Sequence, residues 1–103
     1  MCDESKIYRV VVHDDAKQML FNHVRFVANV SISAARKLSA TLYKAFTSLE
    51  TAPHRCPVYR TRRVFGTYRQ LIISCYQIVF SINEKENIVN IEYILDSRQD
   101  NDV

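Results

Sequence analysis

The sequence predicts an α+β fold: a hairpin of two helices packed on an antiparallel sheet of about four strands, in the order β-α-α-β-β-β. Two observations carry this prediction. Apolar residues recur at helical spacing in two consecutive segments of the first half, and the last third alternates β-branched and aromatic residues with polar ones. Because helices and strands are segregated along the chain, the helices should cover one face of the sheet. The length of 103 residues fits one domain spanning residues 1–103.

The first strand and the first helix follow each other near the N-terminus. Lys6–Val12 is a β-rich segment and the simplest first strand. Asp14 and Asp15 come next, and either can cap a helix and suits the positive end of its dipole. One apolar stripe at spacings of three and four then continues to about Val30. It consists of Ala16, Leu20, Val24 and Val27.

The second helix follows almost without a linker. Ser31 and Ser33 are its candidate caps, and the apolar stripe keeps its helical period to about Glu50. Pro53 cannot continue a helix, so the helix should end before it. Because so few residues separate the two helices, we expect them to form an antiparallel hairpin.

Three strand-like segments fill the last third of the chain. They are Tyr68–Ser74, Tyr76–Ile82 and Ile88–Leu95, and the second alternates most regularly between apolar and polar residues. The polar stretch 83–87 between the last two segments predicts a hairpin loop. The short connections indicate that these three strands form an antiparallel meander.

Composition excludes several classes of protein. The hydrophobic fraction of 48% is typical of a globular domain, and no apolar run approaches the roughly 18 residues that a membrane span needs. The N-terminus lacks the apolar core of a signal peptide. An odd number of widely spaced cysteines indicates reduced thiols and a cytoplasmic protein, and we expect Cys75 to be buried and inert. The cysteines are Cys2, Cys56 and Cys75.

No cofactor or metal is predicted. The sequence has no Gly-rich phosphate loop, no pair of carboxylates at catalytic spacing and no Ser-His-Asp arrangement. His13, His23 and His54 are not spaced as metal ligands, and His54-Arg55-Cys56 has no second pair of ligands after it. His23 adjoins the apolar stripe of the first helix, so it is interpreted as a residue at the helix boundary.

The net charge of +3 is modest, but the charges are unevenly distributed. The segment 51–83 contains no Asp or Glu, and five arginines lie within it. A basic patch of this kind favours an anionic partner, which is a nucleic acid, a nucleoprotein or an acidic peptide. The alternative is a set of surface arginines that only keep the protein in solution. The five are Arg55, Arg60, Arg62, Arg63 and Arg69.

The whole pattern resembles the RelE/ParE superfamily, the small toxins of bacterial type II toxin–antitoxin modules. The resemblance rests on the final hairpin closing on an apolar-X-X-Arg-X-Asp segment, residues 95–100, and on the order of elements. The Ala-Pro exit from the second helix, followed by a basic loop, agrees with it. The resemblance implies growth inhibition, plasmid stabilisation and a hetero-oligomer with a cognate antitoxin protein.

The superfamily contains two kinds of toxin, and the resemblance implies one of two activities. RelE-like members are ribosome-dependent, metal-independent mRNA endoribonucleases, whereas ParE-like members bind DNA gyrase and do no chemistry of their own. By resemblance, Arg69 and Arg98 match two basic positions of the nuclease pattern. Gln77 stands where that pattern has an arginine, and a neutral amide cannot replace a guanidinium as a phosphate clamp. The tail after Arg98 also lacks the Tyr or His of the nucleases.

These departures favour the ParE-like branch, with DNA gyrase as the target and no enzymatic activity. The alternatives are a ribonuclease acting on ribosome-bound mRNA, and a degenerate member that only binds antitoxin. Tyr68 could stand in as an acid or base, but strand alternation places it on the opposite face from Arg69. Arg98 could instead pair with Asp96 or Asp100.

The candidate site follows from this interpretation. For a nuclease, the catalytic candidates are Arg69 and Arg98. For either branch, the candidate target-binding residues are Arg60, Arg62, Arg63, Tyr68, Arg69 and Arg98.

Overall fold

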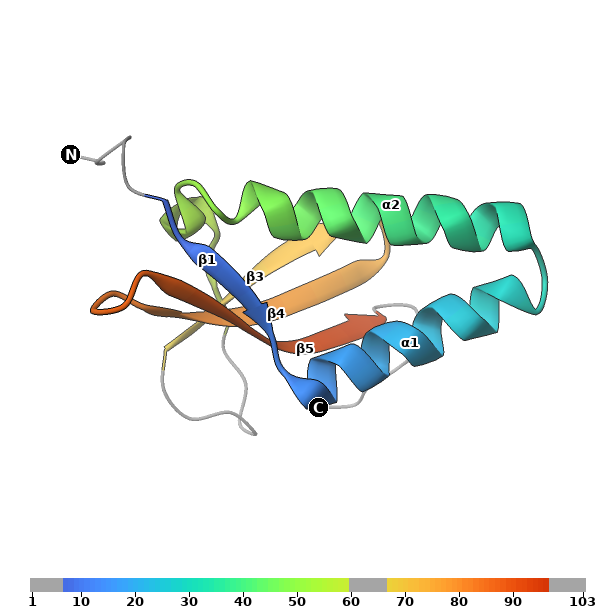
Figure 1. The fold of residues 1–103 in the computed structure, drawn as a ribbon, viewed down its shortest axis with the longest axis horizontal. Helices are drawn as coiled ribbons and strands as arrows, with labels where there is room; N and C mark the ends of the chain where they lie inside the picture. The colour runs from blue at the N-terminus through green and yellow to red at the C-terminus, as the bar shows by residue number, and fades with distance from the viewer. Residues whose placement is uncertain (1–6, 60–66, 97–103) are drawn as a thin grey trace.

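The computed structural model describes residues 7–59 and 67–96, and these residues form two helices packed on a five-stranded sheet (Figure 1). The predicted fold class is confirmed, and the order of the elements agrees with the prediction except for one short additional strand. The elements are β1 (Arg9–Val12), α1 (Asp14–Ala28), α2 (Ile32–Ser48), the 3-10 turn η1 (Pro53–Arg55), β2 (Val58–Tyr59), β3 (Tyr68–Ile73), β4 (Tyr76–Asn83) and β5 (Ile88–Asp96).

The sheet has the strand order β1-β5-β4-β3-β2 and is mixed, whereas the sequence predicted about four antiparallel strands. The meander β3-β4-β5 is antiparallel as predicted, but β1 lies parallel to β5. The alternation of apolar and polar residues in a strand does not indicate whether a distant strand pairs with it in parallel or antiparallel. The pairing of β1 with β5 could therefore not be predicted from the sequence. The extra strand, β2, has two residues, which is too short for a periodic pattern.

Helix α1 begins at Asp14, so Asp14 is the first residue of the helix and not its N-cap. Its N-cap is His13, which makes no side-chain capping hydrogen bond. Asp14 and Asp15 therefore lie in the first turn, where their charges favour the positive end of the helix dipole, and the prediction that one of them caps the helix is wrong.

Helix α2 is capped by Ser31, one of the two predicted serines. The Ser31 Oγ accepts a hydrogen bond from the Ala34 N–H at 3.1 Å. The helix ends at Ser48, and Ala52 then adopts a left-handed conformation with φ 50° before Pro53 opens η1. This sharp turn directs the chain toward the edge of the sheet, where β2 pairs with β3.

The core lies between the two helices and the face of the sheet that they cover. Both helices lie on this face in Figure 1, with α1 against β5 and α2 against β3. A bulge opposite Val79 and Phe80 shifts the register of β4 against β5. The side chains that are fully buried come mostly from β4, β5 and α2, and include Phe80, Ile78, Ile91, Ile94, Val89, Leu42 and Leu49.

The turn between β4 and β5 confirms the predicted hairpin loop. The Asn83 side-chain oxygen accepts hydrogen bonds from the backbone N–H groups of Lys85 and Glu86, at 3.0 and 3.1 Å. Asn87 has a φ of 57°, which Asn tolerates better than most residues. The turn therefore has a defined shape and holds Glu84 beside the end of the sheet.

Candidate functional site

Only two of the six predicted target-binding residues, Tyr68 and Arg69, belong to the described part of the chain. Both lie at the start of β3, where it pairs with the short edge strand β2. The other four lie outside the described residues. These are Arg60, Arg62, Arg63 and Arg98.

Tyr68 and Arg69 lie on opposite faces of the sheet, as strand alternation predicted. Arg69 pairs with Phe80, which is fully buried under the helices, so Arg69 lies on the covered face. Tyr68 pairs with Tyr59 on the opposite face, which we call the open face. The two candidate residues therefore cannot act together on one group.

Two amides lie on β3 and β4 of the open face. Gln77 donates a hydrogen bond from its Nε2 to the Oε1 of Gln70 on the neighbouring strand, at 3.1 Å. Both side chains are half-buried, and neither carries charge. By the resemblance described above, Gln77 stands at an arginine position of the nuclease pattern, and its amide supplies no cation to a phosphate.

Arg69 is anchored to the backbone of the segment after α2. Its Nη1 donates to the carbonyl oxygens of His54, at 3.3 Å, and Cys56, at 2.6 Å. Arg55 has a similar role beside it, because its guanidinium donates to the carbonyl oxygens of Ser48, Thr51 and Ala52. By donating to carbonyl oxygens at and beyond the end of α2, both arginines stabilise the basic segment itself.

A cluster of polar side chains lies beside Arg69 on the covered face. The His54 Nε2 is hydrogen-bonded to the Oε2 of Glu84, and the Tyr8 hydroxyl donates to the other carboxylate oxygen at 2.8 Å. The rings of Tyr8 and His54 make an edge-to-face contact, with their centroids 6.0 Å apart. The segment just before β1 is thereby joined at one point to η1 and to the β4–β5 turn, which are far from it in sequence.

A hollow of about 210 Å³ opens next to this cluster, and we call it the His54 hollow. A guanidinium, an imidazole, a hydroxyl and a carboxylate meet there beside one apolar wall. Its lining residues are His54, Thr67, Arg69, Ile82 and Glu84. This set can bind an anion and can transfer protons.

Sequence reasoning did not identify His54 and Glu84 as functional residues. Their separation of 30 residues follows no local motif, and Glu84 was interpreted only as part of a hairpin loop. The pairing depends on the left-handed turn at Ala52, which brings η1 against the end of β4. Nothing in the sequence around Ala52 indicates that turn.

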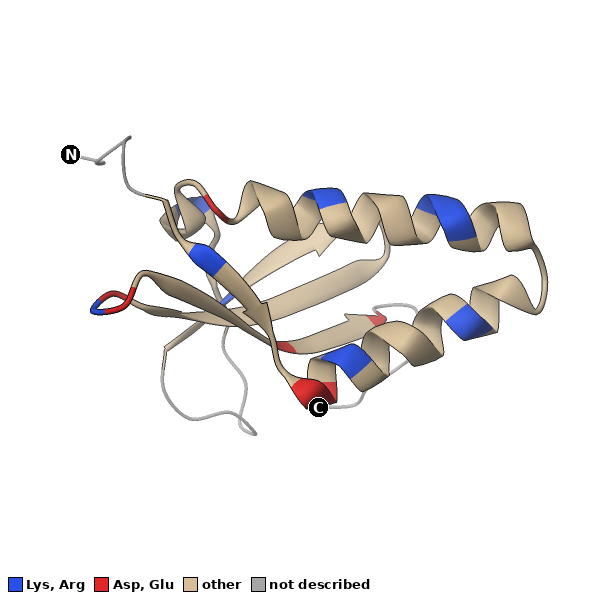
Figure 2. Ribbon diagram, viewed as in Figure 1, with Lys and Arg blue, Asp and Glu red and all other residues tan. Residues whose placement is uncertain are grey.

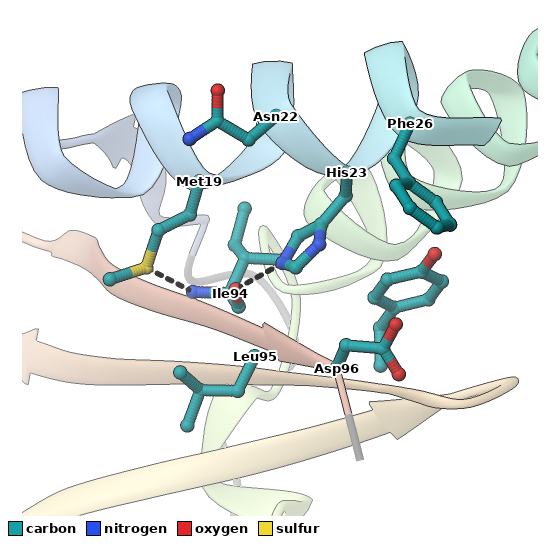
Figure 3. A pocket seen from close by; sticks show the side chains of 8 residues that line it. Met19, Asn22, His23, Phe26, Ile94, Leu95 and Asp96 are labelled. Carbon is teal, nitrogen blue, oxygen red and sulfur yellow. Dashed lines mark hydrogen bonds between the residues drawn. The ribbon is translucent and has the colours of Figure 1, made fainter. Parts of the chain in front are cut away.

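A second hollow, of about 410 Å³, lies between α1 and the ends of β4 and β5 (Figure 3). His23 points into it from α1, and its Nε2 is 2.8 Å from the Ile94 carbonyl oxygen. The edge-to-face contact of His23 with Tyr76, at 5.1 Å, fixes the ring further. His23 therefore links helix and sheet, in agreement with its interpretation as a boundary residue. Met19, Phe26 and Asp96 are among the other residues around this hollow.

The cysteines correct one prediction. Cys75 is half-buried, and the buried thiol is that of Cys56, directly after η1. Burial raises the pKa of the Cys56 thiol, and the neighbouring charges of Arg55 and Arg69 act in the opposite direction. Within residues 7–59 and 67–96, no three His, Cys, Asp or Glu side chains gather as metal ligands.

The remaining charges are spread over the described surface. Figure 2 shows lysines and arginines along both helices and acidic residues at the start of α1 and in the β4–β5 turn. No described helix is long and apolar enough to cross a membrane. Among the described residues, the His54 hollow brings a guanidinium, an imidazole and a carboxylate into one lining.

Comparison with known families decides the identity of the fold. Residues 10–101 match the model of the ParE toxin of the type II toxin–antitoxin system parDE. The chain belongs to the ParE toxin family. It is accordingly a toxin of a type II toxin–antitoxin system, and the predicted superfamily is confirmed.

Solved structures of related fold agree with this assignment. The toxin–antitoxin complex RelBE2 from Mycobacterium tuberculosis contains a chain with 19% identity and a TM-score of 0.66, over 91% of this chain and 95% of that one. The archaeal RelE–RelB complex from Pyrococcus horikoshii OT3 gives 16% identity and a TM-score of 0.58, over 91% and 99%. At these identities the likeness shows the fold alone. A search of curated proteins finds no significant match.

Proposed function

We propose that this toxin stops growth by binding DNA gyrase in the cytoplasm, without chemistry of its own, and that a cognate antitoxin neutralises it. Two facts support the proposal: the match to the ParE toxin family, and the neutral pair that Gln77 forms with Gln70 on the open face. Removing one group that stabilises charge in a transition state typically costs about 10²–10³ in rate. A nuclease site with an amide in that position would be severely weakened.

The deciding experiment is a brief induction of the toxin without antitoxin. We expect cells to form filaments and to induce a DNA-damage response, while mRNA 5′ ends within translated codons stay unchanged. Purified toxin should inhibit supercoiling by gyrase, and added antitoxin should restore it. Discrete new 5′ ends together with normal supercoiling would refute the proposal.

The antitoxin is proposed to hold this toxin by covering a sheet edge and the helical hairpin. Strands β1 and β2 are the edges of the sheet, and an edge strand can accept a further strand from a partner. The hairpin also exposes large apolar side chains, including Phe21, Phe26 and Val30, which are 59%, 69% and 83% exposed. Co-expression with the adjacent small open reading frame should give a complex that co-purifies. High yields of the toxin alone, without growth arrest, would contradict this.

The arginines outside the described residues remain proposed contacts to the target. If Arg60, Arg62 and Arg63 contact an anionic surface, replacing all three with Ala should weaken target binding and its salt dependence while leaving the fold intact. Arg98 and Tyr68 are proposed to contribute to the same interface. A triple variant that keeps full toxicity and complex formation would reduce these three arginines to ordinary surface charges.

One observation favours the alternative of a ribosome-dependent mRNA endoribonuclease. Arg69 lies in one hollow with His54 and Glu84, and a carboxylate–imidazole pair beside a cation can serve acid–base cleavage without a metal. This arrangement lies on the covered face, whereas the residue that departs from the nuclease pattern, Gln77, lies on the open face. The same mapping of 5′ ends after a pulse tests it, because only the nuclease leaves discrete cuts.

A further inference from the structure

The hollow beside His23, which we call the His23 hollow, lies where β5 extends past its neighbour β1. β1 pairs with β5 only as far as Ile91, and α1 packs beside the remaining residues of β5. Two side chains of α1 hold the backbone of Ile94 there: its N–H donates to the Met19 Sδ at 3.4 Å, and its carbonyl oxygen accepts from His23 (Figure 3). The backbone of this wall is therefore already engaged, and a ligand must be recognised by side chains.

The polar side chains around the His23 hollow supply hydrogen-bond acceptors. A carbonyl oxygen only accepts, so the His23 Nε2 carries the proton of its bond to Ile94, and in the neutral imidazole Nδ1 is then an acceptor. The Asp96 carboxylate, in a residue only 7% exposed, is the one formal charge among the described residues that line the hollow. Asp96 takes part in a further interaction, but a carboxylate has about four acceptor positions and can receive several donors. A ligand that suits this lining brings donors and a positive charge.

Two aromatic rings complete the lining. Tyr76 is almost fully buried and makes its edge-to-face contact with His23, whereas Phe26 is 69% exposed. Figure 3 shows Phe26 and His23 extending from α1 toward the strands, with Asp96 on the strand side of the hollow. The face of an aromatic ring attracts a cation, and a planar guanidinium also stacks on it, whereas an ammonium is a compact and strongly hydrated charge. The rings therefore favour a guanidinium over an ammonium.

We propose that the His23 hollow binds a guanidinium group carried on an aliphatic chain, as in an arginine side chain. A guanidinium can form two parallel hydrogen bonds with the Asp96 carboxylate and turn its face to the Phe26 ring. The volume of about 410 Å³ falls in the range of about 300–1,000 Å³ that is typical of ligand pockets, and Met19 and Leu95 offer apolar surface to the aliphatic chain. The net charge of the protein, +3, opposes a cation, so binding depends on these local groups. The inference does not rest on gyrase as the target.

The first test is a titration of the full-length toxin, released from its antitoxin, with N-acetyl-arginine methylamide and with its lysine and glutamate counterparts. The NMR signals of the imidazole nitrogens provide the readout. We expect the His23 signals to move and saturate with the arginine compound, at lower concentration than with the lysine compound, while His13 and His54 stay in place. The glutamate compound should give no saturable shift.

A short peptide with one arginine between apolar residues distinguishes the two sources of a guanidinium. Saturation of the His23 signals at a much lower concentration of peptide than of the arginine compound identifies a segment of a partner protein as the ligand. Saturation at the same concentration identifies a site for a small molecule.

The second test uses two matched pairs of variants. Asp96→Asn should weaken binding about tenfold or more, because a charge-assisted hydrogen bond is lost, whereas Asp15→Asn removes a carboxylate that does not line the hollow and should leave affinity unchanged. Phe26→Leu keeps an apolar side chain but removes the ring, which should cost about two- to fivefold. Phe21→Leu, on the same helix and 59% exposed, should have no effect. Since both phenylalanines are exposed, this pair gives a reading even if Asp96→Asn does not fold.

Three outcomes would overturn the proposal. One is a His23 response that does not saturate with the arginine compound, or that saturates equally with the lysine or glutamate compound. Another is an equal loss of affinity in the two variants of a pair, which would place the binding elsewhere. The third is binding that appears only in Arg98→Ala, since the arginine of the chain itself would then be the partner of Asp96. None of these measurements involves gyrase, so failure here leaves the supercoiling assay to judge the proposed function separately.

Discussion

The two faces of the sheet near β3 differ in how their polar groups are arranged. On the open face, Gln70 and Gln77 satisfy each other on adjacent strands, and both are neutral. On the covered face, Arg69, His54 and Glu84 come from three elements, and all three side chains are ionisable. Neighbouring residues of one strand, Arg69 and Gln70, thus belong to entirely different environments.

This difference separates two kinds of functional evidence. Comparison with a family pattern draws attention to the position of Gln77, because a single strand position can be matched by sequence alone. The cluster around His54 arises only when the chain folds, since its members are distributed from β1 to the β4–β5 turn. The open face of this toxin therefore carries a neutral amide pair, while the covered face carries an imidazole–carboxylate pair.

The largest expected effect comes from removing the anchor on the covered face. Arg69→Ala should lower the free energy of unfolding by about 2–3 kcal/mol, because the His54 and Cys56 carbonyls lose a charged donor. Urea denaturation of the toxin measures this. Arg55→Ala, which loses more exposed bonds to carbonyls at and beyond the C-terminal end of α2, should cost only about 1 kcal/mol. Equal losses in the two variants would mean that Arg69 is an ordinary surface residue.

An intermediate effect is expected from the carboxylate of the cluster. Glu84→Gln keeps the shape of the side chain but removes the charge that pairs with His54 and accepts from Tyr8. Since the Glu84 and His54 side chains are both about half exposed, the loss in unfolding free energy should be about 1 kcal/mol. Glu86→Gln in the same turn is the control and should stay within about 0.5 kcal/mol of the parent. If both variants behave alike, the cluster does not hold β1, η1 and β4 together.

The sequence was sufficient to predict those elements of the fold whose periodicity is local. Both helices and the meander β3-β4-β5 were predicted within two residues at most of their ends, because apolar spacing records which face is buried. The serine cap of α2 was also predicted. The parallel pairing of β1, the two-residue strand β2 and the cap of α1 were not, since each depends on tertiary contacts rather than on a repeating pattern.

The candidate site was less predictable for the same reason. Strand alternation was enough to separate Tyr68 from Arg69. The role of Arg69 as a clamp on the His54 and Cys56 carbonyls needs the left-handed conformation of Ala52, which is energetically unfavourable for a residue with a Cβ. Propensity argues against such a conformation, so sequence reasoning had no basis for bringing η1 against β3.

The smallest effect on stability should come from Gln77→Arg, which places a guanidinium on the open face. The longer side chain can still donate to Gln70 Oε1, so the unfolding free energy should change by less than about 1 kcal/mol. RNA should nevertheless stay intact after a pulse of this variant, because a cation without a positioned base and acid forgoes the factor of about 10²–10⁴ that proton transfer contributes. Gln70→Arg, on the same face of the neighbouring strand, is the matched control. Discrete mRNA cuts with Gln77→Arg but not with Gln70→Arg would contradict this prediction. They would show that an arginine at position 77 is enough to give the toxin nuclease activity, so that the two faces would differ functionally only in charge.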